Sequence, residues 1–286
     1  MLWSTVPVGT RLLVRHGGVF SVEFLSAARL LMASLVFILA HLWYQRRVSA
    51  PFFLPTRRIG WLFIAAAGIF LNYLFYGIGL RYTTASATAV VSQVNATLTV
   101  LLAAVLLGER LTRRKLLGML IALIGVLLVV FQPGAVDVLL TPGYLKGNLI
   151  EIIAAMAWPF YAIGQTKLQE NRDDQQVLMR IFVLAFIFSL LVLPFSGPFI
   201  LRTPTVQDWL YLLFLGIGST AVAYWLFALA VRHLQTSEST MFNVLIPVFG
   251  LLLSHWLLAE RIQTHDIAGL LLVVTGLLLI LWRRMM

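Results

Sequence analysis

The sequence predicts an all-α integral membrane protein with ten transmembrane helices, arranged as two inverted repeats of five helices each. An apolar composition, apolar runs of membrane-spanning length and an internal repeat are the observations that predict it. Hydrophobic residues make up 60% of the 286 residues and charged residues 11%, whereas about a quarter of the residues in a soluble domain are charged. A span needs about 20 apolar residues, so the chain has room for roughly ten spans and short loops but not for a separate soluble catalytic domain.

Of the ten expected spans, all but the first have nearly full length. Each of these is an apolar run bounded by charged residues or by Pro and Gly. They cover residues 22–43, 59–80, 84–107, 116–132, 147–166, 177–197, 208–230, 236–259 and 266–282. The 14 residues before Arg15 would form about 21 Å of helix against a hydrocarbon core of about 30 Å. We therefore expect the first helix to be short or truncated.

Lys and Arg are concentrated in alternate loops, which predicts the orientation of the chain. The loops after the second, fourth, sixth and eighth spans and the C-terminal tail hold most of them, among them Arg46, Arg57, Arg114, Lys167 and Arg284. Because cytoplasmic loops carry the excess of Lys and Arg, these loops and both termini are expected on the cytoplasmic side of the cell (inner) membrane. The formal net charge of +10 then reflects topology, and no nucleic-acid partner is expected.

The two halves of the sequence are similar to each other. An offset of 148 residues aligns Trp61, Gly68 and Tyr76 with Trp209, Gly216 and Tyr224. An offset of 151 aligns Arg29, Glu109, Gly118 and Gly125 with Arg180, Glu260, Gly269 and Gly276, and an offset of 155 aligns Trp3 and Gly9 with Trp158 and Gly164. Rare residue types in one colinear order indicate a duplication of whole bundles.

The expected repeats are residues 1–132 and 133–286. Each contains five spans, an odd number, so the second must enter the membrane from the opposite side. Inverted repeats of this kind are typical of secondary transporters, in which one half rocks against the other around a central site. A duplicated channel or membrane enzyme is the alternative.

Several short segments resemble one known family. They are LWS at residues 2–4, AARLLMA at 27–33, LLGERL at 106–111 and LLAERI at 257–262, with a Gly-containing last span in each half. This pattern resembles the EamA family of the drug/metabolite transporter superfamily over nearly the whole chain. The resemblance implies a ten-helix inner-membrane carrier that exports, or less often imports, small metabolites such as amino acids. The chain departs from the family in its shorter segment before Trp3 and in Glu151, where members commonly have a small or apolar residue.

Glu151 is the main candidate for a functional charge. It lies near the start of the sixth expected span, where a carboxylate costs about 2.5–3.5 kcal/mol on insertion scales. We therefore expect it to face a wet cavity, where it either couples transport to protons or balances the charge of a substrate amine. The alternative is a carboxylate that reaches the interface or pairs with Arg29.

Other candidates are aromatic and amide side chains inside expected spans. Trp158 and its repeat mate Trp3 lie away from the interfaces where Trp usually anchors a helix, and Tyr76 and Tyr224 are also repeat mates. Pro247 cannot donate to the carbonyl of Asn243, which frees a polar group there. The expected substrate-binding set is Trp3, Asn72, Tyr76, Gln93, Asn95, Glu151, Trp158, Tyr224 and Asn243. The alternatives are core packing for the rings and interhelical hydrogen bonds for the amides.

Glu109 and Glu260 end expected spans on opposite sides, and we expect each to organise the turn that follows. Arg29 and Arg180 lie inside spans near their starts, and we expect them to anchor those helices. Ser92 belongs to a stripe of small residues expected to pack against another helix. His255 lies within the ninth expected span.

Signatures of enzymes are absent from the sequence. It contains no HExxH, GxSxG or GxxxxGK[ST] motif and no Cys, so no catalytic residue, metal or cofactor is expected. The predicted function is a secondary active transporter, an exporter of amino acids or related zwitterions or organic cations, acting as a monomer or weak dimer. No Lys or Arg is expected at mid-span, which disfavours polyanions. An intramembrane enzyme or lipid-handling protein using Glu151 and His255, and a passive pore, are the alternatives.

Overall fold

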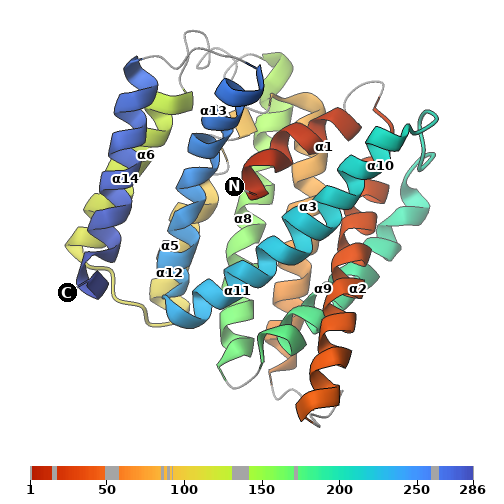
Figure 1. Ribbon diagram of the computed structural model, residues 1–286, viewed down its shortest axis with the longest axis horizontal. Coiled ribbons are helices and arrows are strands. Elements are labelled where there is room, and N and C mark those ends of the chain that lie inside the picture. The colour runs from red at the N-terminus through yellow and green to blue at the C-terminus, as the bar shows by residue number, and fades with distance from the viewer. Residues whose placement is uncertain are drawn as a thin grey trace.

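The computed structural model describes the backbone of residues 2–14, 18–48, 58–84, 87–88, 91, 93–130, 142–170, 173–258 and 264–285. Within these ranges the regular elements are helices, gathered into one bundle (Figure 1). An isolated antiparallel bridge joins Phe20 and Ile200 at one end of the bundle. The prediction of an all-α protein is therefore confirmed for the described part of the chain.

The helices follow one another with short connections. In the first half they are η1 (Leu2–Thr5), α1 (Val6–Val14), α2 (Val22–Val48), α3 (Ile59–Tyr82), α5 (Gln93–Leu106) and α6 (Arg113–Val130). In the second half they are α8 (Pro142–Gln169), α9 (Asp174–Val192), η2 (Leu193–Phe195), α10 (Val206–Leu213), the π-helix η3 (Phe214–Val222), α11 (Ala223–His233), α12 (Thr236–Met241), η4 (Phe242–Val244), α13 (Leu245–Leu258) and α14 (Thr264–Met285).

Among the described residues, six helical segments are long and apolar enough to cross a membrane. They are Val22–Tyr44, Ile59–Tyr82, Pro142–Gln169, Asp174–Phe195, Val206–His233 and Thr264–Leu281. These segments coincide with the second, third, sixth, seventh, eighth and tenth expected spans, so the chain is a multi-pass membrane protein. The arrangement of ten spans as two inverted repeats stays a prediction.

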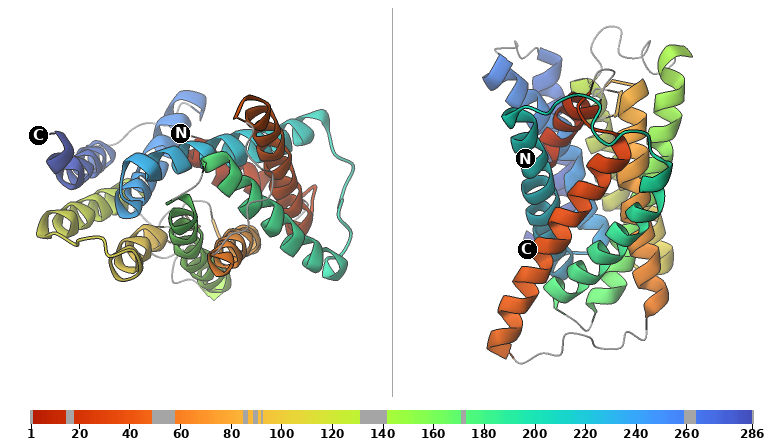
Figure 2. Two further views of the ribbon diagram at one scale, coloured as in Figure 1. Left: turned by 90° about the horizontal axis from the view of Figure 1, so that it is seen from below. Right: turned by 90° about the vertical axis from the view of Figure 1, so that its right-hand side faces the viewer.

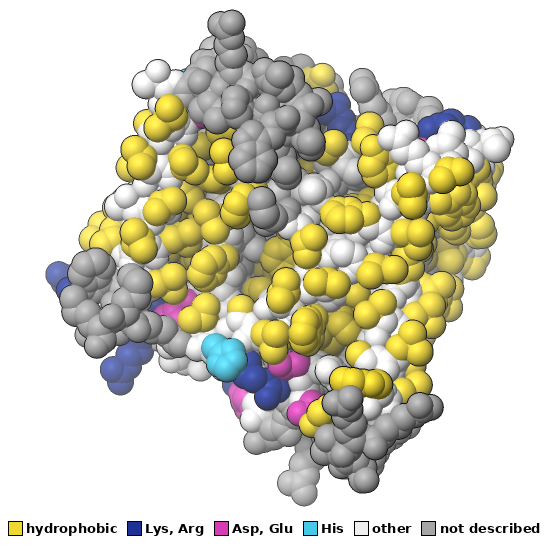
Figure 3. All heavy atoms as spheres, in the orientation of Figure 1, with side chains coloured by type: hydrophobic (Ala, Val, Ile, Leu, Met, Phe, Trp, Pro, Cys, Tyr) yellow, Lys and Arg dark blue, Asp and Glu magenta, His cyan; other side chains and the backbone are white. Residues whose placement is uncertain are grey.

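The outer surface fits a lipid environment. Figure 3 shows hydrophobic side chains over the middle of one face and most of the visible Lys and Arg toward the two ends. Large apolar side chains such as Leu39, Val105 and Leu191 are more than half exposed. Exposure of this kind costs little in hydrocarbon, whereas in water it would mark a large interaction surface.

The loops expected on one side of the membrane lie at one end of the bundle. In Figure 1 the ends of α2, α8 and α11, the start of α6 and the C-terminus are all at the lower end, and the starts of α2, α8, α10 and α14 are at the upper end. The described N-terminus lies about halfway along the bundle, as expected for a short first helix. Which end faces the cytoplasm stays a prediction.

Glycines let α3 and α8 pack with their backbones in contact. A Cβ placed on Gly68 would lie 2.7 Å from the backbone nitrogen of Tyr161, and one on Gly164 would lie 3.0 Å from the carbonyl oxygen of Trp61. Small residues at such positions are typical of helix pairs in membranes. Because the two helices belong to different predicted halves, this contact joins the halves.

The last helices of the predicted halves, α6 and α14, form a reciprocal pair at one side of the bundle (Figure 2). A Cβ on Gly118 would lie 2.6 Å from the carbonyl oxygen of Gly276, and a Cβ on Gly269 would lie 2.6 Å from that of Gly125. Gly118 and Gly269 are repeat mates, and so are Gly125 and Gly276. Replacing each glycine of one contact by its repeat mate gives the other contact. A two-fold axis between antiparallel helices produces this relation.

The expected span at residues 236–259 is divided into α12, η4 and α13. Pro247 provides the physical reason, because it has no N–H to donate to the carbonyl of Asn243 four residues earlier. The chain forms a 3₁₀ turn at Phe242–Val244 instead of continuing the α-helix. This turn brings Asn243 to the wall of the cavity described next.

Candidate functional site

A cavity lies between the two predicted halves of the chain. Its volume is about 100 Å³, measured as the space open to the centre of a water molecule, whereas one buried water needs about 10–15 Å³ on this measure. The first half contributes η1, α1, α2, α3, α5 and Thr88, and the second half contributes α8, α11, η4 and α13. A ligand of several heavy atoms could therefore touch both halves at once.

The structure brings together eight of the nine predicted substrate-binding residues. The cavity wall includes Trp3, Asn72, Tyr76, Asn95, Glu151, Trp158, Tyr224 and Asn243. Gln93 is buried near the start of α5 but is not part of this wall. The reason is helical geometry, since residues two apart on a helix point about 200° apart. Gln93 and Asn95 cannot both face the cavity.

Glu151 is buried in the cavity wall and lies against Gly79 of α3. Its Oε1 accepts a hydrogen bond from the Thr88 hydroxyl at 3.2 Å. A Cβ on Gly79 would lie 2.7–2.8 Å from Glu151 Cγ, Cδ and Oε1, so the carboxylate occupies the space that the missing side chain leaves. The alternative of an ion pair with Arg29 is not found, because the ion pairs formed by described residues do not include Glu151.

Arg29 does not act only as the helix anchor that the sequence predicts. Arg29 lies in α2, is only 5% exposed and lines the cavity. Its Nε donates to the Thr220 hydroxyl at 3.3 Å, and its guanidinium carbon lies 4.3 Å from the centroid of the Tyr73 ring. The sequence signal that points to Arg29 is the one that points to Glu151, because an ionisable residue inside a span is a functional candidate by default.

The π-helix η3 supplies the support for Arg29. The Thr220 hydroxyl donates to the carbonyl of Leu215 five residues earlier at 2.8 Å and lies 2.9 Å from the Tyr73 hydroxyl. π-Helical turns occur often at functional sites. Here the wider turn holds Thr220, Tyr73 and Arg29 in one hydrogen-bonded and stacked group across α2, α3 and η3.

Aromatic rings cover another part of the wall. The rings of the repeat mates Trp3 and Trp158 contact each other with centroids 5.3 Å apart and nearly perpendicular planes, and Tyr224 lies 5.4 and 5.7 Å from them. Trp3 Nε1 donates to the carbonyl of Ser219 at 3.1 Å, which fixes its orientation. Edge-to-face rings of this kind form a rigid apolar surface.

The polar atoms of the wall differ in whether they already have partners. Asn72 Nδ2 donates to the carbonyl of Ala154 at 2.8 Å, so this amide also joins α3 to α8. Within the described part of the chain, Trp158 Nε1 and Asn95 Oδ1 are buried without a hydrogen-bond partner. Pro159 removes the usual helix donor for the carbonyl of Ala155, which also lines the cavity. A ligand or water could satisfy these groups.

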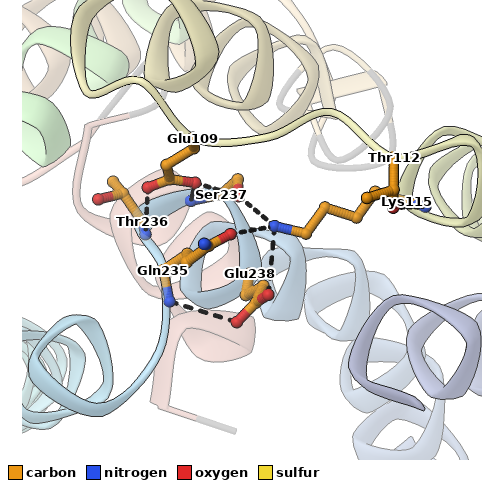
Figure 4. A network of polar contacts seen from close by, with 7 residues as sticks. All are labelled: Glu109, Thr112, Lys115, Gln235, Thr236, Ser237 and Glu238. Carbon is orange, nitrogen blue, oxygen red and sulfur yellow. Dashed lines mark hydrogen bonds and ion pairs between the residues drawn. The ribbon is translucent and has the colours of Figure 1, made fainter. Parts of the chain in front are cut away.

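Below the cavity, a polar network closes the lower end of the bundle (Figure 4). The Glu109 carboxylate accepts hydrogen bonds from the backbone N–H groups of Thr236 and Ser237 at 2.8 and 3.2 Å and from the Ser237 hydroxyl. Lys115 contacts Gln235, Ser237 and Glu238. This agrees with the structural role expected for Glu109. Its mate Glu260, Ser92 and the His255 side chain lie outside the described residues.

Comparison with known proteins gives matches over nearly the whole chain. The model of the EamA-like transporter family matches residues 1–131 and 145–282. The chain is 26% identical over 280 residues to the uncharacterized transporter YetK of Bacillus subtilis (strain 168), covering 96% of this chain and 81% of that protein. It is 25% identical over 227 residues to the uncharacterized transporter YyaM of the same organism, covering 79% of this chain and 73% of that protein.

A more distant match comes from a plant. The chain is 23% identical over 241 residues to WAT1-related protein At2g40900 of Arabidopsis thaliana, covering 77% of this chain and 61% of that protein. Among solved structures, one crystal structure matches with a TM-score of 0.79 and 23% identity, covering 99% of this chain and 94% of that chain. At this identity the structural match shows a shared fold.

Proposed function

The chain belongs to the EamA-like transporter family, and from this premise we propose that it is a secondary transporter of small zwitterionic or cationic metabolites such as amino acids. One observation carries the proposal. A cavity with polar and aromatic walls, including Glu151, lies inside an apolar helical bundle and is built from both halves of the chain. Sites at the interface of two repeats are where secondary transporters bind their substrates.

The proposed mechanism is alternating access. The reciprocal glycine contacts between α6 and α14 support an inverted relation between the halves. The contact of Trp3 with its mate Trp158 supports an axis that passes close to the cavity. In the conformation described, the Glu109 network joins the loop after α5 to α12 at the lower end. Rocking of one half against the other would separate these segments and open the cavity toward that end.

Energy for transport would come from a gradient or from exchange, since the sequence has no nucleotide-binding motif. Glu151 is the proposed coupling residue. It either takes up a proton in each cycle or balances a substrate ammonium group. Both events are favourable because they neutralise a carboxylate that is otherwise buried without a partner charge. Export from the cytoplasm across the cell (inner) membrane is the proposed direction, with the Lys- and Arg-rich end of the bundle inside.

Counterflow in proteoliposomes tests this proposal. The purified full chain would be reconstituted, loaded with a panel of unlabelled amino acids, amines and other metabolites, and supplied with the labelled compound outside. We expect saturable uptake that depends on unlabelled substrate on the far side. Flux that neither saturates nor responds to the far side would indicate a pore. Folded protein without saturable flux for any compound would rule out the proposed transport.

A further inference from the structure

Two opposite charges line the same cavity without pairing with each other. Arg29 on α2 and Glu151 on α8 are 5% and 2% exposed, respectively. The ion pairs between described residues, defined by an N to O distance of at most 4.0 Å, involve neither of them. The two charged groups are therefore farther apart than a direct ion pair, and both border the space where a ligand would lie.

Each charge is only partly satisfied by the protein. Glu151 accepts one hydrogen bond, from Thr88 at Oε1. A guanidinium has five N–H donors, and of those of Arg29 only Nε has a hydrogen-bond acceptor within the described part of the chain. Burying a charge without a partner is unfavourable. A ligand that brings an anion to Arg29 and a cation to Glu151 would offset both costs.

The guanidinium of Arg29 is held in a fixed orientation. Its Nε donates to the Thr220 hydroxyl and its guanidinium carbon lies 4.3 Å from the centroid of the Tyr73 ring, so Nη1 and Nη2 are the donors left for a ligand. This planar pair of donors matches the two oxygens of a carboxylate. Tyr76, one helical turn from Tyr73 on α3, lines the same cavity.

We infer that Arg29 binds the carboxylate of the transported molecule while Glu151 binds its ammonium group. The substrate is then a small zwitterion of the α-amino acid type, and neither an organic cation nor an organic anion. The rings of Trp3, Trp158 and Tyr224 line the same cavity and offer an apolar surface to the substrate side chain. This inference rests on the proposed function and narrows its substrate class from zwitterions and cations to zwitterions. A zwitterion adds no net charge to the cavity.

Three sets of matched compounds test the inference. Each set contains an amino acid, its decarboxylated amine and its deaminated acid: alanine, ethylamine and propionate; leucine, isoamylamine and 4-methylpentanoate; phenylalanine, phenethylamine and phenylpropionate. Binding to the purified full chain would be measured by calorimetry, and transport by counterflow. We expect the amino acid of at least one set to bind about tenfold or more tightly than its amine and its acid, as expected for losing one hydrogen bond to a charged group.

Variants then assign each charge to its partner. Arg29→Gln should lower the affinity for the amino acid to that for the amine and leave the amine affinity unchanged. Glu151→Gln should lower the affinity for the amino acid to that for the acid. Arg180, the repeat mate of Arg29, lies on α9 outside the cavity wall, so Arg180→Gln is the matched control and should leave the ranking unchanged. Arg29→Lys keeps the charge without the paired donors and should give an intermediate loss.

Other outcomes would overturn the inference. If the amine, or the acid, binds as tightly as the amino acid in every set, Arg29 or Glu151, respectively, does not have the proposed role, while saturable counterflow of any panel compound would leave the proposed transport intact. An unchanged ranking in a folded Arg29→Gln protein, or an undiminished preference for the amino acid over its amine in a folded Arg29→Lys protein, would exclude paired carboxylate binding by Arg29. If neither variant folds, the ranking of the three compounds by the wild-type protein decides the matter. Absence of counterflow for every compound of the wider metabolite panel would overturn the proposed function as well.

Discussion

At the scale of single residues, the cavity depends on charges that are buried and on a glycine that makes room for one of them. Glu151 lies against Gly79 and accepts a hydrogen bond from Thr88, without a cation as partner among the described residues. Such a carboxylate is unfavourable in the empty cavity. Its unpaired charge also favours the binding of a proton or a substrate ammonium group. Removal of the charge should therefore raise the stability of the protein and lower transport.

We predict that Glu151→Gln keeps the fold and lowers transport. The carboxamide has the same shape and no charge, so the melting temperature should stay the same or rise, while transport falls about tenfold or more through loss of a charge-assisted contact. The wild-type rate should change with pH and that of the variant should not, because a carboxamide does not titrate. Initial rates in proteoliposomes across the neutral pH range measure both effects.

Glu170 provides the matched control for that experiment. It follows α8 outside the membrane-spanning segment, and the hydrogen bond from Arg58 holds the pKa of its carboxyl below the ordinary value. The carboxyl therefore stays ionised across the neutral range in wild-type protein. Glu170→Gln should leave the pH profile of transport unchanged, and a Glu151→Gln profile identical to that of wild-type protein would end the proposed coupling role.

We predict that Gly79→Ala destabilises the protein and impairs transport. The new Cβ would lie 2.7 Å from Glu151 Cγ, and overpacking of this kind costs about 1–3 kcal/mol. The double variant Gly79→Ala, Glu151→Ala should recover stability but not transport. Gly60, at the start of the same helix, has open space around its Cβ position, so Gly60→Ala should be neutral or slightly stabilising. Thermal melting of the variants measures these differences, and equal melting temperatures for Gly79→Ala and Gly60→Ala would contradict the prediction.

At the scale of elements, short and irregular helices position the site more than the long ones do. The π-helix η3 presents Thr220 to Arg29, and the 3₁₀ turn η4 presents Asn243 to the cavity. The helix α12 before it has six residues, and both its own capping box and the Glu109 carboxylate from the loop after α5 bind its first turn. This short helix is therefore tied to the first half of the chain by polar contacts at its start.

We predict that Glu109→Ala loosens the lower end of the bundle. Loss of the carboxylate leaves the N–H groups of Thr236 and Ser237 without their acceptor, which should cost about 1–3 kcal/mol. A cysteine placed at Thr166, whose hydroxyl contacts that of Thr236 at 2.8 Å, should react faster with a soluble maleimide in the variant. Glu170→Ala removes the partly exposed ion pairs with Arg58 and Lys167 at the same end and should change stability by about 0–1 kcal/mol. Equal labelling rates in both backgrounds would show that Glu109 does not hold this end closed.

At the scale of the whole molecule, two contacts between the predicted halves have the symmetry expected of an inverted duplication. The glycine contacts of α6 and α14 exchange with their repeat mates, and Trp3 contacts its own mate Trp158. Arg29 and its mate Arg180 do not follow this symmetry, since only Arg29 lines the cavity. These contacts are thus symmetric while the charges of the site are not, which suits a substrate with two different ends.

We predict that repeat mates are accessible from opposite sides of the membrane. The chain contains no Cys, so a single introduced cysteine is the only labelling site. Ile59 and Gln207, mates at the offset of 148, are both exposed at helix starts. In intact cells, an impermeant maleimide should label Gln207→Cys and not Ile59→Cys, and permeabilisation should expose the latter. Labelling of both from one side would exclude the inverted topology and the alternating-access proposal with it.

The sequence is sufficient to predict most of the polar and aromatic residues of the cavity wall but not its second charge. Polar and aromatic residues inside apolar spans are costly unless they face a cavity or each other, so Glu151, Trp158 and Asn243 can be selected from their positions within the expected spans. The position of Arg29 near the start of α2 favours an anchor at the helix end, because that position does not show what packs around the side chain. Gln93 and Asn95 are both predicted because two amides so close together in an apolar run suggest a polar lumen, whereas residues two apart on α5 point in different directions.

The amino-acid sequence is enough to identify a helical membrane protein with a duplicated pattern, because hydrophobic length and the spacing of rare residues are properties of the chain in one dimension. Which side chains meet follows only from the packing of the helices in three dimensions. Gly79 makes room for Glu151 from another helix, and Thr220 reaches Arg29 through a π-turn. These contacts depend on the rotation of each helix about its own axis and on its position along the bundle. Close packing of the backbones fixes both, and the local sequence of a helix does not specify them.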